Sequence, residues 1–168
     1  MNLFAYTGGA TLAAAAAGAS VTHVDASKGM VTWAKENAVA SGLGDAPIRW
    51  LVDDCVKFVE REIRRGNTYD AIIMDPPSYG RGPKGEIWKI EDMIHPLIKL
   101  CTKILSKDAL FFLVNSYTTG LAPAVLTYMI STELKPWNGH VDSQEIGLPV
   151  TDSGLVLPCG ASGRWERD

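Results

Sequence analysis

Short apolar segments alternate with helix-forming segments along most of this 168-residue chain. The segment Ala71–Met74 is almost entirely apolar, which is typical of a parallel strand that is buried on both faces. Because consecutive parallel strands need a crossover connection, usually a helix, the alternation predicts a doubly wound α/β domain with a mostly parallel sheet. We expect strands at 2–6, 21–24, 48–52, 71–74 and 110–114, and helices at 11–17, 27–40, 55–65, 90–105 and 122–134.

Two strand-like segments at 141–148 and 154–158 close the chain, and the residues between them suit a hairpin. We therefore expect an antiparallel hairpin at the C-terminal end of the sheet, within one domain that spans residues 1–168. The hydrophobic fraction of 46% fits a globular domain. The alanine-rich run 10–19 is too short for a membrane span and no secretory signal is visible, so we expect a cytoplasmic protein. The cysteines and histidines show no metal-ligand spacing, so the sequence assigns no metal site.

Glycines and carboxylates follow the predicted strands at the ends where doubly wound folds bind ligands. Gly8 and Gly9 allow the backbone to approach a ligand closely at the start of a helix. Asp25, about 17 residues after Gly8, is placed like the acidic residue that binds ribose hydroxyls in nucleotide-binding βαβ units. An aspartate there can instead serve only to cap the next helix, and the spacing alone leaves both interpretations open. The groups at the strand ends are Thr7-Gly8-Gly9, Asp25, Asp53-Asp54, Asp75-Pro76-Pro77 and Asn115-Ser116.

A rigid turn follows the strand predicted at 71–74. Pro76 and Pro77 fix the backbone and leave carbonyl oxygens without neighbouring donors, directed into the crevice. These oxygens, together with Asp75, can accept hydrogen bonds from a planar nitrogen-containing substrate, and Tyr79 can stack on its ring. The alternative is a rigid start to a loop with a buried tyrosine. The sequence thus predicts a catalytic group made of Asp75, Pro76, Pro77 and Tyr79.

The distinctive motifs occur in the order Asn2–Gly9, Val24–Ser27, Asp53–Asp54 and Asp75–Tyr79. This order resembles that of class I S-adenosylmethionine-dependent methyltransferases. The residues of the motifs are similar to those of the bacterial large-subunit ribosomal RNA methyltransferases, a group that contains cytosine-C5 and guanine-N7 enzymes. Within this group the chain resembles a less characterised branch. The resemblance covers nearly the whole chain and implies a Rossmann-like methyltransferase fold, S-adenosylmethionine as cofactor and ribosomal RNA as partner.

The resemblance also implies a role for each motif. In the family, the first glycine loop holds the methionine part of the cofactor, the acid after the second strand holds ribose, and the acid after the third contacts adenine. The cofactor-binding residues implied for this chain are Tyr6, Thr7, Gly8, Gly9, Asp25, Ala26, Asp54 and Cys55.

The chemistry depends on whether a nucleophilic cysteine is present. Cytosine-C5 transfer needs one after the fourth or fifth strand, where this chain has Ser78, Asn115 and Ser116. We therefore expect methylation of a base nitrogen in RNA. The alternatives are a small-molecule or protein methyltransferase and a non-catalytic cofactor-binding domain. Ribosomal relatives carry an upstream RNA-binding portion, so we expect this chain to be one domain of something longer. The oligomeric state stays open.

The segment Gly80–Lys89 combines glycines, cations and aromatic side chains beside the proposed target site. Together with Tyr79 and Trp88, its cations suit phosphate contacts and base stacking. The alternative is a solvated flexible loop whose Trp88 docks onto the core. Its glycines permit a lid that orders when substrate binds. The cations are Arg81, Lys84 and Lys89.

Overall fold

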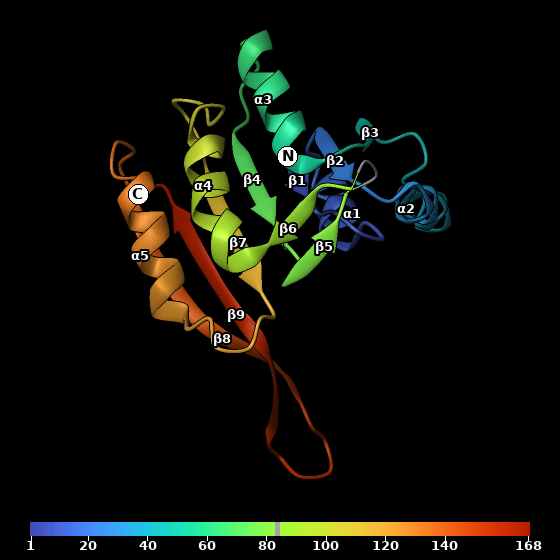
Figure 1. The fold of residues 1–168 in the computed structure, drawn as a ribbon. Helices are drawn as coiled ribbons and strands as arrows, with labels where there is room; N and C mark the ends of the chain where they lie inside the picture. The colour runs from blue at the N-terminus through green and yellow to red at the C-terminus, as the bar shows by residue number, and fades with distance from the viewer. Residues whose placement is uncertain (83–84) are drawn as a thin grey trace.

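Seven strands form one sheet in the computed structural model, which describes residues 1–82 and 85–168 (Figure 1). The strand order is β3-β2-β1-β4-β7-β9-β8. The strands from β3 to β7 in this order run parallel, whereas β9 lies antiparallel between β7 and β8. The predicted α/β fold with a C-terminal antiparallel hairpin is therefore confirmed. The strands are β1 (Asn2–Leu3), β2 (Val21–Asp25), β3 (Ile48–Val52), β4 (Ala71–Met74), β7 (Phe111–Ser116), β8 (His140–Pro149) and β9 (Val156–Glu166).

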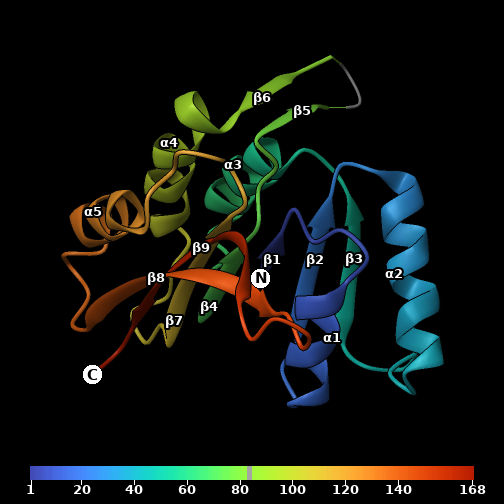
Figure 2. The same ribbon diagram turned by 90° about the horizontal axis from the view of Figure 1, so that it is seen from below.

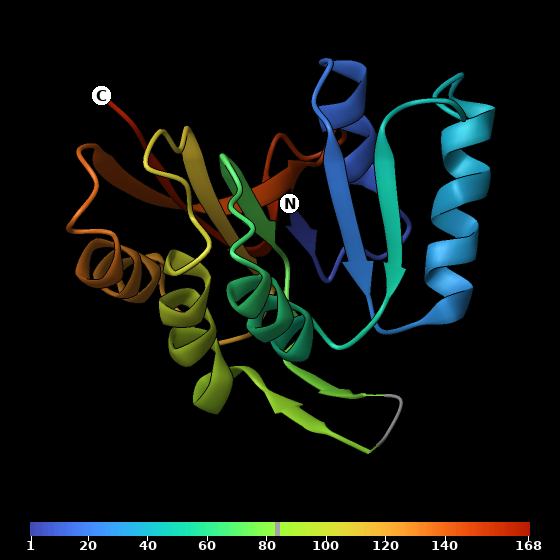
Figure 3. The same cartoon turned by 90° about the horizontal axis from the view of Figure 1, so that it is seen from above.

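Helices cover both faces of the sheet. α3, α4 and α5 pack side by side on one face, and α1 and α2 lie against β2 and β3 on the other (Figure 2, Figure 3). Right-handed crossovers on the two sides of β1 produce this arrangement. In the described part of the chain, no helix is long and apolar enough to cross a membrane. The helices are α1 (Gly9–Ala16), α2 (Lys28–Ala40), α3 (Cys55–Arg65), α4 (Ile90–Thr102) and α5 (Pro123–Glu133).

A large apolar cluster lies between the sheet and the helices α3, α4 and α5. Phe58 and Ile98 enter it from the helices, and Leu3, Ile72 and Phe112 enter it from β1, β4 and β7. All five side chains are buried, and burial of each stabilises the fold by about 1.5–3 kcal/mol. Since this packing holds the three central strands, it also determines where the loops at their carboxyl ends emerge.

The chain leaves β1 earlier than the strand predicted at 2–6. Phe4 and Tyr6 have φ angles of 53° and 49°, in the left-handed region, which ends the regular strand after Leu3. β9 extends beyond the predicted segment 154–158 because it pairs with β7 on one side and with β8 on the other. Pro96 lies inside α4, beyond its first turn.

A separate two-stranded hairpin contains most of the segment Gly80–Lys89, for which the sequence predicts a lid or a flexible loop. β5 (Tyr79–Arg81) pairs antiparallel with β6 (Ile87–Lys89). Alternate residues of a strand face opposite sides, and Trp88 accordingly faces inward and is buried. Pro83 and Lys84, which the sequence prediction included in this segment, lie outside the described residues.

The topological switch point of the sheet lies between β1 and β4. From β1 the chain winds outward to β2 and β3 on one side, and β4 and β7 extend the sheet on the other. Loops on the two sides therefore diverge at the carboxyl edge and leave a crevice, which is where this fold binds ligands. Leu3 pairs in register with Met74, so the residues that follow them, Phe4 and Asp75, leave the sheet at the same level.

Candidate active site

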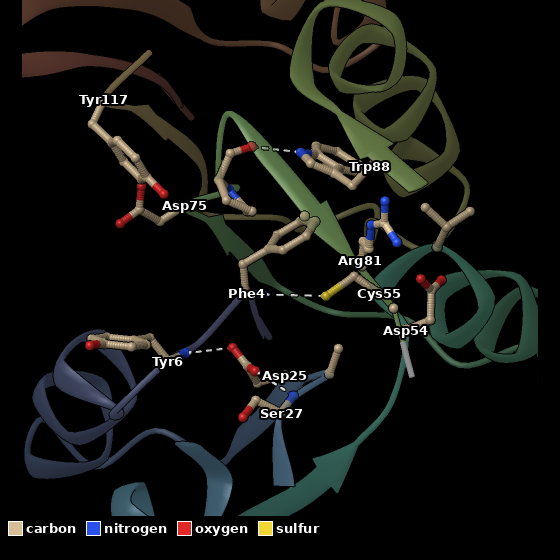
Figure 4. Close-up of a pocket in the computed structure, with 15 residues that line it drawn as sticks. Phe4, Tyr6, Asp25, Ser27, Asp54, Cys55, Asp75, Arg81, Trp88 and Tyr117 are labelled. Carbon is tan, nitrogen blue, oxygen red and sulfur yellow. Dashed lines mark hydrogen bonds between the residues drawn. The ribbon is translucent and has the colours of Figure 1, made fainter. Parts of the chain in front are cut away.

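A cavity of about 580 Å³ opens at this carboxyl edge (Figure 4). Its volume lies in the range of small-molecule binding sites. The loops after β1, β2, β3, β4 and β7 all contribute to it, and the β5–β6 hairpin forms one wall. The lining residues are Phe4, Tyr6, Asp25, Ala26, Ser27, Asp54, Cys55, Val56, Asp75, Pro77, Gly80, Arg81, Gly82, Trp88 and Tyr117.

The cavity brings together many of the residues predicted from the sequence. Those that line it are Tyr6, Asp25, Ala26, Asp54, Cys55, Asp75 and Pro77. The predicted residues outside the lining are Thr7, Gly8, Gly9, Pro76 and Tyr79. The lining residues to which the sequence prediction assigned no site role are Phe4, Ser27, Val56 and Tyr117, whereas Gly80 and Gly82 belong to the segment predicted as a lid.

The Asp25 carboxylate is held in a fixed orientation at the end of β2. Its Oδ2 accepts a hydrogen bond of 2.9 Å from the Tyr6 backbone N–H, and its Oδ1 accepts one of 2.8 Å from that of Ser27. Each carboxylate oxygen has two lone-pair directions, so both keep capacity for a further donor. A pair of neighbouring ligand hydroxyls therefore fits this carboxylate.

The loop between β1 and α1 contributes Phe4 and Tyr6 to the cavity lining, and the two predicted glycines lie outside the lining. Gly8 precedes α1 with a φ of +91°, and the Gly8 N–H donates to the Ala5 carbonyl at 3.0 Å. A Cβ at Gly8 would lie 3.1 Å from the Ala34 Cβ of α2, which is tighter than ordinary packing. Gly9 has open space where its Cβ would point. Only the first of the two predicted glycines is therefore required by the backbone.

We expect Gly8→Ala to destabilise the protein by about 1–2 kcal/mol, because an alanine at positive φ is strained and its methyl group presses on α2. Gly9→Ala is the matched control, and it should leave stability unchanged or raise it by a few tenths of a kcal/mol. Urea unfolding of the two variants measures both effects. Equal stabilities would contradict the requirement for glycine at position 8.

The two carboxylates after β3 have different surroundings. Asp53 forms an ion pair with Arg61 on α3 and does not line the cavity. Asp54 lines the cavity and caps α3, because its Oδ1 accepts a hydrogen bond of 2.9 Å from the Lys57 backbone N–H. Of the two, Asp54 is thus the one available to a ligand.

Cys55 lines the cavity at the first residue of α3 but is not a nucleophile. Its Sγ accepts a hydrogen bond of 3.4 Å from the Phe4 backbone N–H, and the residue is buried. Burial raises the pKa of the Cys55 thiol far above its usual value, so the group stays protonated near neutral pH. Cys55 therefore acts as a small packing residue that supports the unusual backbone of Phe4.

Asp75 lines the cavity on the side of β4. The residue is exposed overall, yet partial burial of its carboxyl group raises the pKa above its usual value of 3.8. Figure 4 shows the Tyr117 ring on the same side of the cavity as Asp75, and Asp54 on the opposite side. The cavity thus has two ends with separate carboxylates.

The second proline carbonyl of the turn is already occupied. The sequence predicts that both proline carbonyls lack neighbouring donors, but the Trp88 indole N–H donates to the Pro77 oxygen at 2.7 Å (Figure 4). Trp88 also packs against Phe4, with ring centroids 4.9 Å apart. The β5–β6 hairpin is therefore tied to the turn after β4 and to the loop after β1. The expectation that the Pro77 carbonyl is free is wrong.

Tyr79 lies away from the position expected of a stacking residue. Its ring is 51% exposed, outside the cavity lining, and its hydroxyl accepts a hydrogen bond of 3.3 Å from the Arg81 Nε. Arg81 itself lines the cavity. Farther along the hairpin, Glu86 pairs with Lys57 of α3, so the hairpin is also attached to the element that carries Asp54.

The residues present fit a nucleoside cofactor. Asp25 offers two fixed carboxylate oxygens to paired hydroxyls, and Asp54 offers an acceptor to an amine. The apolar surfaces between them, from Phe4, Ala26 and Val56, suit a flat heterocycle. The donor set thus matches the hydroxyl, amine and ring faces of an adenosine-like group.

Comparison with known protein families agrees with an adenosine-containing cofactor. Residues 1–131 match the model of the S-adenosylmethionine-dependent methyltransferase family. The chain is similar to the ribosomal RNA large subunit methyltransferase K/L of Shewanella frigidimarina, with 37% identity over 60% of this chain and 15% of that protein. It is also similar to the ribosomal RNA large subunit methyltransferase K of Neisseria meningitidis, with 31% identity over 69% of this chain and 33% of that protein. The chain thus spans between a seventh and a third of these relatives.

Solved structures share the fold over almost all of the chain. One is a SAM-dependent methyltransferase from Agrobacterium tumefaciens, with a TM-score of 0.93, 44% identity, and coverage of 99% of this chain and 55% of that one. Another is described as a methyltransferase complexed with SAH, with a TM-score of 0.80, 24% identity, and coverage of 98% of this chain and 44% of that one. The second likeness shows the fold alone.

Proposed function

Since this chain belongs to the family of S-adenosylmethionine-dependent methyltransferases, we propose that residues 1–168 form a catalytic domain that methylates a nitrogen atom of a base in ribosomal RNA. Its cofactor is S-adenosylmethionine, which supplies an activated methyl group on a sulfonium sulfur. The observation that carries the proposal is the two-ended cavity, with Asp25 and Asp54 at one part and Asp75 at another. A protein with this chemistry has only to align donor and acceptor and to exclude water.

The cofactor end of the proposal uses residues whose geometry is fixed. Asp25 accepts hydrogen bonds from the ribose hydroxyls, and Asp54 accepts one from the adenine amine. Ala26 and Cys55 pack beside these two groups. The loop from Tyr6 to Gly9 lies along the methionine part, with Tyr6 as its member in the cavity lining.

The acceptor end of the proposal centres on Asp75. Its carboxylate lines the cavity and accepts a hydrogen bond from the N–H of the acceptor base, which positions the nitrogen for transfer. As the C–N bond forms and the methyl–sulfur bond of the donor breaks, Asp75 takes the proton that the nitrogen loses. Pro76 is buried and outside the lining, so its carbonyl is a secondary partner at most. The Pro77 carbonyl holds Trp88 and so positions the turn.

The proposal of a nitrogen rather than a carbon as methyl acceptor depends on the protonation state of the cysteine thiols. Burial raises the pKa of Cys55 and Cys101 far above the usual thiol range, so neither supplies the thiolate that cytosine-C5 transfer needs. Cys159 does not line the cavity. A nitrogen acceptor needs no covalent adduct. Ribosomal RNA as the substrate, and the cytoplasm as its location, are supported by the names of the relatives that the chain resembles.

The test is methyl transfer to total ribosomal RNA from cells that lack the gene, with a labelled methyl donor and mass spectrometry of the digested nucleosides. We expect label on a base nitrogen, and we expect turnover to persist when Cys55, Cys101 and Cys159 are all replaced by alanine. RNA that contains 5-fluorocytosine should trap no covalent protein adduct. A trapped adduct would reject the nitrogen assignment, and transfer to small molecules or proteins in place of RNA would reject the substrate class.

A further inference from the structure

Tyr117 lines the cavity on the side of Asp75, where the sequence predicts that Tyr79 stacks on the substrate. It follows β7 and leaves 56% of its surface exposed. Met74 of β4 pairs with Val114 of β7, and β7 continues to Ser116 beside β9, so Tyr117 is the first residue after the strand. Its ring therefore stands at the acceptor end of the cavity (Figure 4).

The backbone around Tyr117 is held by contacts from three directions. The Thr118 N–H donates to the Ser116 Oγ at 3.1 Å, and Ser116 is buried. The Thr118 hydroxyl forms a hydrogen bond of 2.7 Å with the Ser78 hydroxyl, which joins the loop after β7 to the turn that carries Asp75. On the third side, a Cβ at Gly160 of β9 would lie 2.8 Å from the Tyr117 Cα, so β9 passes close to the backbone at Tyr117.

These contacts hold the backbone that carries a half-exposed aromatic ring, in a cavity that is also lined by the Asp75 carboxylate. A surface tyrosine with an unrestrained backbone would lose more conformational entropy on binding than one whose neighbour Thr118 is already hydrogen-bonded to Ser78 and Ser116. Aromatic rings beside a hydrogen-bonding group are the usual means of gripping a flat base. Tyr79 does not meet these conditions. It lies on β5 outside the cavity lining, and its hydroxyl accepts a hydrogen bond from Arg81.

We propose that Tyr117 is the acceptor-binding aromatic residue, whose ring stacks on the face of the base that Asp75 holds by its edge. The inference rests on the proposed function, since it concerns the same site and its acceptor. The Ser78–Thr118 hydrogen bond is the positioning element, because it sets the ring relative to the Asp75 turn. Tyr117 and Asp75 together define a slot for a planar nitrogen heterocycle, presented as an unpaired base.

The test compares Tyr117→Ala, Tyr117→Phe and Tyr79→Ala, with Tyr128→Ala as the matched control. Tyr128 is a 70% exposed tyrosine on α5, outside the cavity lining. Total ribosomal RNA from cells lacking the gene is the probe, varied in concentration at saturating S-adenosylmethionine. We expect Tyr117→Ala to lower kcat/KM for this RNA about 10-fold. Tyr117→Phe should stay within about 2-fold of the parent because it keeps the ring, and Tyr79→Ala should lose less than Tyr117→Ala.

Cofactor affinity separates stacking from a general loss of the site. Calorimetry should give the same S-adenosylmethionine affinity for Tyr117→Ala and for the parent, and thermal unfolding should show that both are folded. An unchanged kcat/KM in Tyr117→Ala, a parallel fall in cofactor affinity, or a greater loss in Tyr79→Ala would each overturn the inference. An inactive parent chain on the same RNA would instead reject the proposed function, and the inference with it.

Discussion

Replacing Asp25 by alanine should weaken S-adenosylmethionine binding by about 1.5–3 kcal/mol, or about 10- to 150-fold, in a chain that still folds. The carboxylate loses charge-assisted hydrogen bonds to the ribose hydroxyls. It also releases the backbone N–H groups of Tyr6 and Ser27, which it holds at 2.9 Å and 2.8 Å. Both effects act on the cofactor end of the cavity, so calorimetric titration with the cofactor measures them directly.

Asp53→Ala is the control for Asp25→Ala. Asp53 also follows a parallel strand, but it pairs with Arg61 outside the cavity lining, so its loss should change cofactor affinity by less than about 2-fold. Asp54→Ala should act in the same direction as Asp25→Ala but more weakly, since a neutral adenine amine is the donor. A folded Asp25→Ala variant with the parent affinity would show that Asp25 serves only as a loop and helix-start residue.

The carboxylates of the site were predictable from the sequence because each one ends a locally encoded strand. Asp25, Asp54 and Asp75 each come at or just after the end of a short segment, rich in β-branched and apolar residues, that the sequence predicts as a strand. The doubly wound fold then brings the carboxyl ends of those strands to one edge. No knowledge of distant contacts is needed for this step, and the structure accordingly places all three in one cavity lining.

The aromatic residues of the site were not predictable in the same way. Tyr79 lies close to the prolines in the sequence. The direction of its side chain, however, is set by the pairing of β5 with β6, and β6 begins only at Ile87. Tyr117 reaches the cavity because Ser78 and Thr118, 40 residues apart, bond to one another. The occupied Pro77 carbonyl likewise depends on Trp88, 11 residues along the chain. Such contacts arise from loop packing and leave no local pattern.

Replacing Asp75 by alanine should lower kcat for methyl transfer about 100-fold or more, with S-adenosylmethionine affinity largely unchanged. Asp75 lies at the end of the cavity away from Asp54, so its loss removes the partner of the acceptor and spares the cofactor. Single-turnover assays with saturating cofactor and RNA isolate the methyl-transfer step. Asp75→Asn keeps an amide oxygen as acceptor and should retain more activity than Asp75→Ala. A parent-like rate in Asp75→Ala would remove Asp75 from the catalytic group.

The raised pKa of Asp75 also predicts how its replacement affects stability, and this effect is opposite to the effect on activity. In the unfolded chain the carboxyl group titrates near its usual pKa of 3.8, whereas partial burial raises its pKa in the folded state. The folded state therefore binds the proton more tightly, and the stability from the neutral group is present below 3.8 and is lost as pH rises through the raised pKa. At neutral pH the ionised Asp75 thus costs stability, so Asp75→Asn should unfold at the parent temperature or above it while its turnover falls. Lost turnover together with a lowered unfolding temperature would instead mean that Asp75 supports the fold.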